Sequence, residues 1–194
     1  MFSSEDLLPP EFYCRDPVRV ARELLGHRLI RRLEGHLLEG ILVEAEAYLG
    51  QEDPASRAHQ GLKNYNRPMW KQPGRTFIYN VHRYWMLNVV AHQPNQVGAV
   101  LIRALEPTRG IQIMTRNRGV EKLRELTSGP GKLTIALSID NSLNGSPVTS
   151  PDSEIRIAAR EAQVQVATSH RIGVKKDLES RLRFYIKENR FVSR

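Results

Sequence analysis

Residues 43–50, which read VEAEAYLG, constrain the fold most, because they follow an apolar run and then alternate in character. In a β-strand, residues two apart point the same way, so Glu44, Glu46 and Tyr48 would share one face. Two carboxyl groups beside an aromatic ring suit a pocket that stacks a flat ligand and activates water. A half-buried strand with a solvated acidic face has the same pattern, so the segment alone leaves both interpretations open.

The length and composition favour one basic domain. A chain of 194 residues can form a full core as a single unit. Lysine and arginine total 29 against 21 acidic residues, a net charge of +8 that favours a polyanionic partner such as nucleic acid, although an ordinary basic protein shares it. Cys14 stands alone, which excludes an internal disulfide and suits a reducing compartment. With an acidic, proline-containing start and no apolar run of transmembrane length, the sequence predicts a cytoplasmic protein.

Turn signals and periodicity predict one early helix and a series of strands. Asp16 and Pro17 form a cap and first-turn pair for a helix that extends to Leu25, after an N-terminal arm at residues 1–15. Strands are predicted at residues 27–33, 37–48, 75–81, 84–90, 97–106, 155–157, 164–168 and 182–187. No stretch of the sequence resembles a linker to a second domain.

A glycine-rich turn, TSGPGK at residues 127–132, follows a helical pattern at residues 108–126 that breaks near Gly119. A hydroxyl cap and a lysine at a helix start would supply free backbone donors and positive charge, which suit an anion site. The spacing is not that of a Walker loop. The motif by itself fits a plain helix cap equally well.

The polar segment at residues 51–74 interleaves basic residues with Tyr65, Met69 and Trp70. Such a mixture is typical of a nucleic-acid groove, but also of a loop whose large residues pin it to the core. The next segment predicts a hairpin whose tip carries His82 and Arg83. That tip could wedge into a duplex or be a plain exposed turn.

Arg103 lies within an apolar strand, so it must be paired or face a cleft, and Glu46 is an obvious partner. The six histidines lack the short spacings of a metal site, and the sequence contains no HExxH, CxxC or GxSxG motif. We therefore expect no metal and no nucleophilic triad. The remaining groups suit hydrolysis in which a carboxylate deprotonates water.

Five segments in order, LLGHRLIRRLEG, VEAEAYLG, AVLIRALEP, SGPGKLTIAL and the ending from HRIGVKK to LRFYIKENRFVSR, resemble the alkyladenine (3-methyladenine) DNA glycosylase family. The resemblance runs from about Leu24 to the C-terminus. It implies a mixed α/β (α+β) fold over residues 1–194, with a curved, mostly antiparallel sheet flanked by helices and a protruding β-hairpin that inserts into DNA.

The same resemblance implies a monofunctional glycosylase of base-excision repair that acts as a monomer. Such an enzyme flips 3-methyladenine, 7-methylguanine, hypoxanthine or ethenoadenine out of damaged double-stranded DNA. It then hydrolyses the N-glycosidic bond without metal or cofactor, and aromatic stacking holds the extruded base.

Site roles follow from the resemblance residue by residue. Glu46 resembles the general base, and Arg103 with the backbone carbonyl of Ile172 would orient the attacking water. Glu44 lies two residues deeper in the strand, and from this position it is expected to be a structural carboxylate or one that supports the site from behind. The base pocket would contain Tyr48, Tyr79, Asn88, Arg57, His59 and Leu101, of which the two tyrosines stack the base and Asn88 disfavours the guanine amino group. The expected DNA contacts are His82, Arg83, Met69, Arg67, Gly131 and Lys132.

Two positions depart from the family pattern. Arg57 occupies the place of a histidine that contacts the base edge, so either His59 reaches in by a local shift or Arg57 takes that place. A guanidinium there would repel cationic purines and bias the enzyme toward neutral lesions such as hypoxanthine. The hairpin is one residue shorter, and His82 stands where the family has a tyrosine wedge, so less area would stack.

Two alternatives stay open. A lyase acting through a lysine imine is less favoured, because these motifs bring no lysine into the pocket. A non-catalytic nucleic-acid-binding domain with a compromised pocket is the alternative of a different class, and Arg57 is the feature that supports it.

Overall fold

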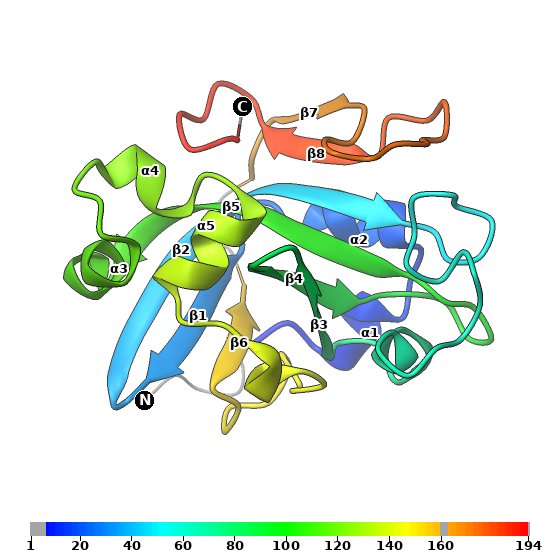
Figure 1. Cartoon of the computed structure of the whole chain (residues 1–194), viewed down its shortest axis with the longest axis horizontal. Coiled ribbons are helices and arrows are strands. Elements are labelled where there is room, and N and C mark those ends of the chain that lie inside the picture. Colours follow the sequence, from blue (N-terminus) through cyan, green and yellow to red (C-terminus); the bar gives the residue numbers. More distant parts are fainter. Residues whose placement is uncertain (1–6, 160–162, 194) are drawn as a thin grey trace.

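The computed structural model describes residues 7–159 and 163–193, and these form a curled antiparallel sheet with a few helices (Figure 1). Residues 1–6 of the predicted N-terminal arm lie outside the described residues. From Leu7 the chain is attached to the sheet, since this residue forms a bridge with Ala158. Helix α1 (Pro10–Tyr13) follows, and its Tyr13 is fully buried in the core. The described part of this segment therefore packs against the rest of the chain.

Eight strands of the described chain form the sheet, in the order β3-β4-β5-β2-β1-β6, with β8 on β2 and β7 on β8. Their bounds are Arg28–Leu33 (β1), His36–Tyr48 (β2), Thr76–Val81 (β3), Tyr84–Val90 (β4), Ala99–Arg109 (β5), Ile155–Ala158 (β6), Val166–Ser169 (β7) and Arg183–Ile186 (β8). All of these pairs are antiparallel. The mixed α+β fold with a mostly antiparallel sheet is therefore confirmed.

Strand β2 organises the sheet because it pairs with three neighbours. Its first half pairs with β1, its second half with β8, and β5 runs along its other edge. The pairing with β5 shifts register on both sides of Glu44, between Leu42 and Ala45. A bulge redirects side chains locally, and this one lies at Glu44, two residues before Glu46.

The helices are short, and their bounds agree with the sequence prediction only in part, because the helix that begins at Pro17 ends at Glu23 rather than at Leu25 and residues 108 and 109, predicted to be helical, belong to β5. Helix α2 (Pro17–Glu23) is capped by Asp16, whose carboxylate accepts the N–H of Val18 at 2.7 Å. The predicted break near Gly119 separates α3 (Ile111–Arg118) from α4 (Leu123–Thr127), because this glycine adopts a left-handed conformation. The remaining helical elements are α5 (Pro130–Ala136) and the 3-10 turns η2 (Arg67–Trp70) and η3 (Asn141–Leu143).

Helix α2 packs against β2, and α5 packs against β4 and β5 (Figure 1). Leu, Val, Ile and Ala side chains from these elements form the main hydrophobic core. The C-terminal end of β2, the starts of β5 and β8 and the hairpin β3–β4 converge around the region where the sequence predicts a site. None of the helices in the described part of the chain could cross a membrane.

Candidate active site

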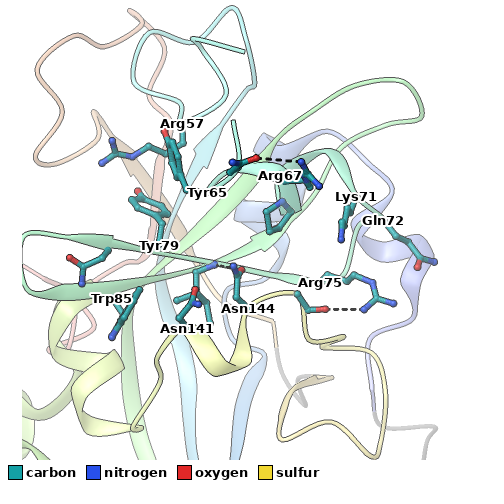
Figure 2. A pocket seen from close by; sticks show the side chains of 15 residues that line it. Arg57, Tyr65, Arg67, Lys71, Gln72, Arg75, Tyr79, Trp85, Asn141 and Asn144 are labelled. Atoms are coloured by element: carbon teal, nitrogen blue, oxygen red, sulfur yellow. Dashed lines mark hydrogen bonds between the residues drawn. The ribbon is translucent and has the colours of Figure 1, made fainter. Parts of the chain in front are cut away.

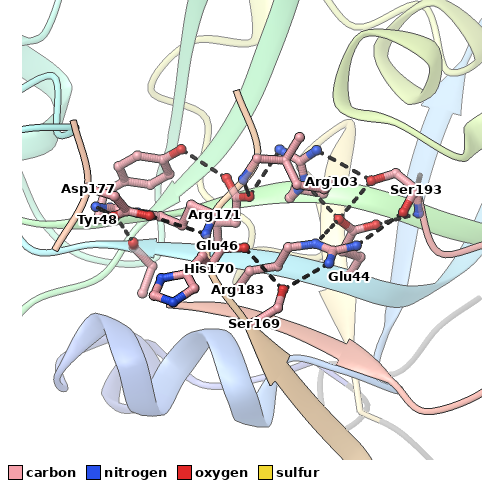
Figure 3. A network of polar contacts seen from close by, with 12 residues as sticks. Glu44, Glu46, Tyr48, Arg103, Ser169, His170, Arg171, Asp177, Arg183 and Ser193 are labelled. Carbon is pink, nitrogen blue, oxygen red and sulfur yellow. Dashed lines mark hydrogen bonds and ion pairs between the residues drawn. The ribbon is translucent and has the colours of Figure 1, made fainter. Parts of the chain in front are cut away.

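Glu46 lies near the end of β2 with no exposed surface, so it is not part of a solvated acidic face. One carboxylate oxygen, Oε1, accepts the backbone N–H of Ile172 at 2.8 Å and lies 3.2 Å from Nη1 of Arg103. The other, Oε2, accepts the phenol O–H of Tyr48 at 2.9 Å (Figure 3). The predicted shared face of Glu46 and Tyr48 is therefore present, and it faces inward.

Glu44 is also fully buried, and it is bound by two arginines and the C-terminal segment (Figure 3). Its Oε1 accepts Nε of Arg103 and Nε of Arg183, each at 2.7 Å. The N–H of Ser193 donates to Oε2 at 2.6 Å, and its hydroxyl donates to Oε1 at 2.8 Å. Arg103 thus bridges both acids, and its shorter contact is with Glu44 rather than with the expected partner Glu46.

The two carboxyl groups have opposite pKa shifts. Burial raises the pKa of Glu46 above its ordinary value, and the nearby Arg103 charge offsets this only in part. Burial also acts to raise the pKa of Glu44, but Arg103, Arg183 and the Ser193 N–H outweigh it and hold the pKa below its ordinary value. The partners of Glu44 therefore favour its charged form, whereas burial favours the protonated form of Glu46.

The loop between β7 and β8 contributes Arg171, which fixes one side of the site. Its guanidinium forms a bidentate ion pair with Asp53, at 2.6 and 2.8 Å, and a further ion pair with Asp177. It also donates to the carbonyl of Ala47 at 3.0 Å and lies 4.6 Å from the centroid of the Tyr48 ring. Burial and the phenol's contact with Glu46 raise the pKa of Tyr48, so its hydroxyl stays protonated and donates.

Sequence reasoning missed several of these supporting residues. Asp53, Arg183 and Ser193 carried no signal, because these partners are distant in the chain and no motif spacing joins them. Asp177 carried none either, although its partner Arg171 is only six positions away. Arg171 did carry one, since it begins the tight turn RIGV within HRIGVKK, one of the segments that carry the resemblance. That turn is present, with Gly173 in a left-handed conformation.

A cavity of about 660 Å³ lies beside Glu46. Its wall contains three groups that contact this carboxylate, namely Tyr48, Arg103 and Ile172. The cavity is also lined by Arg57, Tyr79, Val81, Met86, Leu101, Lys175 and Lys176. Most of the predicted base-pocket residues are thus brought together, and two exposed lysines that sequence reasoning did not place there are added.

His59 and Asn88 lie apart from this lining set. His59 is exposed, and its Nδ1 lies 2.7 Å from the carbonyl of Gln51, so Arg57 rather than His59 reaches the cavity. Asn88 is buried on β4, where its amide nitrogen donates to the carbonyls of Phe77 and Met86 at 3.1 and 3.2 Å. Its strand neighbour Leu101 lines the cavity, which places Asn88 directly beneath the wall.

A larger groove, of about 1460 Å³, lies between η2, β3 and η3 (Figure 2). Arg57, Tyr65, Arg67, Lys71, Arg75, Tyr79 and Trp85 line it, and Figure 2 shows Arg57 beside Tyr65 and Tyr79. The predicted mixture of basic and aromatic residues is therefore present. Met69 is a correction, because its side chain is 1% exposed and packs with Phe77 and Val90, so it belongs to the core and not to the DNA-facing surface.

The glycine-rich turn leads into α5 next to a third hollow of about 630 Å³, which contains Tyr84, Arg103, Gly131 and Lys132. A Cβ on Gly131 would lie 2.9 Å from the Tyr84 ring, so only glycine allows this approach. The expected hydroxyl cap is wrong, because Gly129 caps α5 without a side chain and Thr127 donates its hydroxyl to the Leu105 carbonyl.

The hairpin β3–β4 is closed by a two-residue turn, His82 and Arg83, and both side chains are exposed. His82 has a positive φ of 56°, which histidine tolerates better than most residues. The two predicted DNA contacts at the tip are therefore accessible. Nowhere in residues 7–159 and 163–193 do three His, Cys, Asp or Glu side chains gather closely enough to hold a metal ion.

Comparison with known proteins gives one consistent result. The sequence model of the methylpurine-DNA glycosylase (MPG) family matches residues 11–190. A protein of Aeropyrum pernix is 42% identical over 97% of this chain and 93% of its own length, and one of Carboxydothermus hydrogenoformans is 42% identical over 97% and 99%. A Bacillus licheniformis protein is 37% identical over the full length of both chains. Each of the three carries the name "Putative 3-methyladenine DNA glycosylase".

Proposed function

This chain belongs to the methylpurine-DNA glycosylase family and is a hydrolase of the N-glycosidic bond, and we propose that it excises damaged purines from duplex DNA as a monofunctional monomer. The proposed substrates are 3-methyladenine, 7-methylguanine, hypoxanthine and ethenoadenine. The protein needs no cofactor for this reaction. The observation that carries the proposal is a buried carboxylate, Glu46, whose three contacts all come from groups that line one cavity.

In the proposed reaction the damaged nucleotide is flipped into the cavity of Tyr48 and Tyr79, because the glycosidic carbon cannot be reached inside the stack. The hairpin tip, with His82 and Arg83, enters the duplex and takes the space that the base leaves. Arg67 and Lys132 lie on either side of the hairpin and would bind the phosphate backbone.

Water then attacks the C1′ atom of the sugar, and Glu46 accepts the proton of this water. The electron pair of the N-glycosidic bond passes to the purine nitrogen, so a cationic alkylated base leaves as a neutral molecule. A neutral purine such as hypoxanthine leaves as an anion and takes up a proton from water. Arg103 and the backbone of Ile172 would hold the water at the wall where both meet the carboxylate. The raised pKa of Glu46 suits this role, because the ionised form of a weaker acid is a stronger base and accepts the proton more readily.

One observation favours a lyase reaction, because Lys175 and Lys176 both line the cavity. Both are exposed, whereas a lysine that forms an imine is normally activated by burial or by a neighbouring cation. Borohydride trapping on lesion DNA distinguishes the two reactions. We expect no protein–DNA adduct with the wild-type protein, and a trapped adduct would replace the monofunctional mechanism by a lyase mechanism.

The central experiment compares the wild-type protein with Glu46→Gln on duplexes that each carry one of the four purines. Wild-type protein should release free base and leave abasic sites, whereas Glu46→Gln should bind the same duplexes and release none. Loss of binding with the variant would make Glu46 a structural residue. Release of none of the four purines by wild-type protein would favour a non-catalytic binding domain instead.

A further inference from the structure

Arg57 stacks on one of the two tyrosines that are expected to hold the flipped base. Its central guanidinium carbon lies 4.7 Å from the centroid of the Tyr79 ring. Phe77 also stacks on this ring, with 5.1 Å between centroids and 29° between planes. Tyr79 therefore already contacts two flat groups, and a purine that enters the cavity meets the Arg57 guanidinium as well as the ring.

The other tyrosine, Tyr48, also contacts an arginine, but the two arginines differ in charge balance. The Arg171 side chain has no exposed surface and is neutralised by Asp53 and Asp177. Arg57 is exposed, and no carboxylate among the described residues forms an ion pair with it. Its charge therefore acts on whatever occupies the cavity.

The rest of the lining strengthens this effect. Arg103, Lys175 and Lys176 line the cavity together with Arg57, and the lining set within the described chain contains no acidic residue. Glu46 is buried behind the cavity wall, and its carboxylate forms an ion pair with Arg103. A purine with a fixed positive charge would be repelled there, whereas a neutral purine would not.

We propose that the guanidinium plane of Arg57, supported by the Tyr79 ring, forms one wall of the base pocket and selects uncharged purine lesions over cationic ones. This inference rests on the proposed function. Guanidinium planes stack on nucleobases much as aromatic rings do, so Arg57 supplies a flat surface together with a charge. Hypoxanthine and ethenoadenine, which are neutral, are the favoured class, and 7-methylguanine, which is cationic in DNA, is the disfavoured class.

The test measures single-turnover rates of base release from matched duplexes that contain hypoxanthine or 7-methylguanine. The ratio of the two rates is compared between proteins, so that the different intrinsic reactivities of the two nucleotides cancel. Arg57→Gln should lower the hypoxanthine to 7-methylguanine ratio roughly fivefold or more, because a partly exposed charge is removed from the base. Arg57→His, which keeps a flat ring with less charge, should lower the ratio as well.

Two further variants separate charge, stacking and DNA affinity. Arg57→Lys keeps the charge but not the plane, so both rates should fall while the ratio stays near that of the wild-type protein. Arg67→Gln removes an arginine from the neighbouring groove that does not line the base cavity, so it should lower both rates equally.

The possible failures are distinguishable. If Arg57→Gln and Arg57→His release both bases in the wild-type ratio, the role of Arg57 is overturned and the proposed function stands. If wild-type protein releases neither base, the proposed function fails and this inference fails with it. A preference of the wild-type protein that disappears in Arg67→Gln but not in Arg57→Gln would also overturn the assignment to Arg57.

Discussion

The guanidinium of Arg171 lies 4.6 Å from the ring centroid of Tyr48, and the next residue, Ile172, donates its backbone N–H to Glu46. One buried side chain therefore supports both the expected stacking ring and a contact of the expected general base. Because Asp53 holds this guanidinium through two hydrogen bonds, its position is fixed. We therefore expect Arg171 to act as a positioning residue rather than as a catalytic one.

Arg171→Lys should lower the rate of base release roughly 10- to 100-fold, because small misplacements of reacting groups are costly. A lysine keeps the charge but cannot form the bidentate pair with Asp53 and stack on Tyr48 together. Single-turnover kinetics and lesion-DNA binding measure the effect, and the rate should change far more than the affinity. Arg181→Lys, an exposed position in the same loop, is the matched control and should behave like the wild-type protein. An unchanged rate in Arg171→Lys would show that the loop needs only the charge.

Glu44→Gln should lower the free energy of unfolding by about 3 to 5 kcal/mol, because it leaves two buried arginines without their shared carboxylate. Arg103 and Arg183 both donate to Glu44 Oε1 at 2.7 Å. The matched control is Glu154→Gln, which breaks the ion pair between Glu154 and Arg31. The Glu154 side chain is 56% exposed. Because solvent screens this pair, its loss should cost less than about 1 kcal/mol. Urea unfolding of both variants gives the comparison, and equal costs would refute the structural role of Glu44.

Glu46→Gln should make the protein more stable than wild type at neutral pH while it abolishes catalysis. The pKa of Glu46 is raised by burial, so the native state holds its proton more tightly than the unfolded state. The stability that this group contributes is therefore present below the ordinary glutamate value of 4.5 and is lost as the pH rises through the raised pKa. The stability difference between variant and wild type should shrink toward acid pH in urea unfolding experiments. A variant that is less stable at neutral pH would mean that ionised Glu46 supports the fold.

The pH dependence of the wild-type rate of base release should also report the ionisation of Glu46. Base release should fall as the pH drops through a pKa above 4.5, since only ionised Glu46 can accept a proton. Glu44 has the opposite shift, so its contribution to stability persists above the ordinary value and is lost only as the pH falls through its lowered pKa. An acid limb below 4.5 would assign the rate to a carboxyl group other than Glu46.

Local signals in the sequence predicted the strands, the helix start at Asp16 and the hairpin, because alternation, capping and turn chemistry act within a few residues. The same signals predicted that Glu46, Tyr48 and Arg103 lie together. Residues two apart in a strand share a face, and an arginine within an apolar strand needs a charged partner or a cleft. The contacts of Asp53 with Arg171, and of Ser193 with Glu44, join residues 118 and 149 positions apart. They depend on how the β7–β8 loop and the chain end dock on β2, which no local pattern encodes. The stacking of Arg57 on Tyr79 depends in the same way on the path of the long polar segment.

Met69 shows why residue type alone misled, since an apolar residue within a basic segment can face DNA or face the core. Met69→Ala should lower the free energy of unfolding by about 2 to 5 kcal/mol, because the side chain is 1% exposed and its removal leaves a cavity beside Phe77. The affinity of the folded variant for lesion-free duplex should not change. Arg67→Gln is the matched comparison. It should have little effect on stability but weaken DNA binding, and the slope of the logarithm of the affinity against the logarithm of the salt concentration should fall in magnitude by about 1. Urea unfolding and a salt titration of duplex binding measure both. If Met69→Ala instead kept its stability and lost DNA affinity, the side chain would have to leave the core when DNA binds.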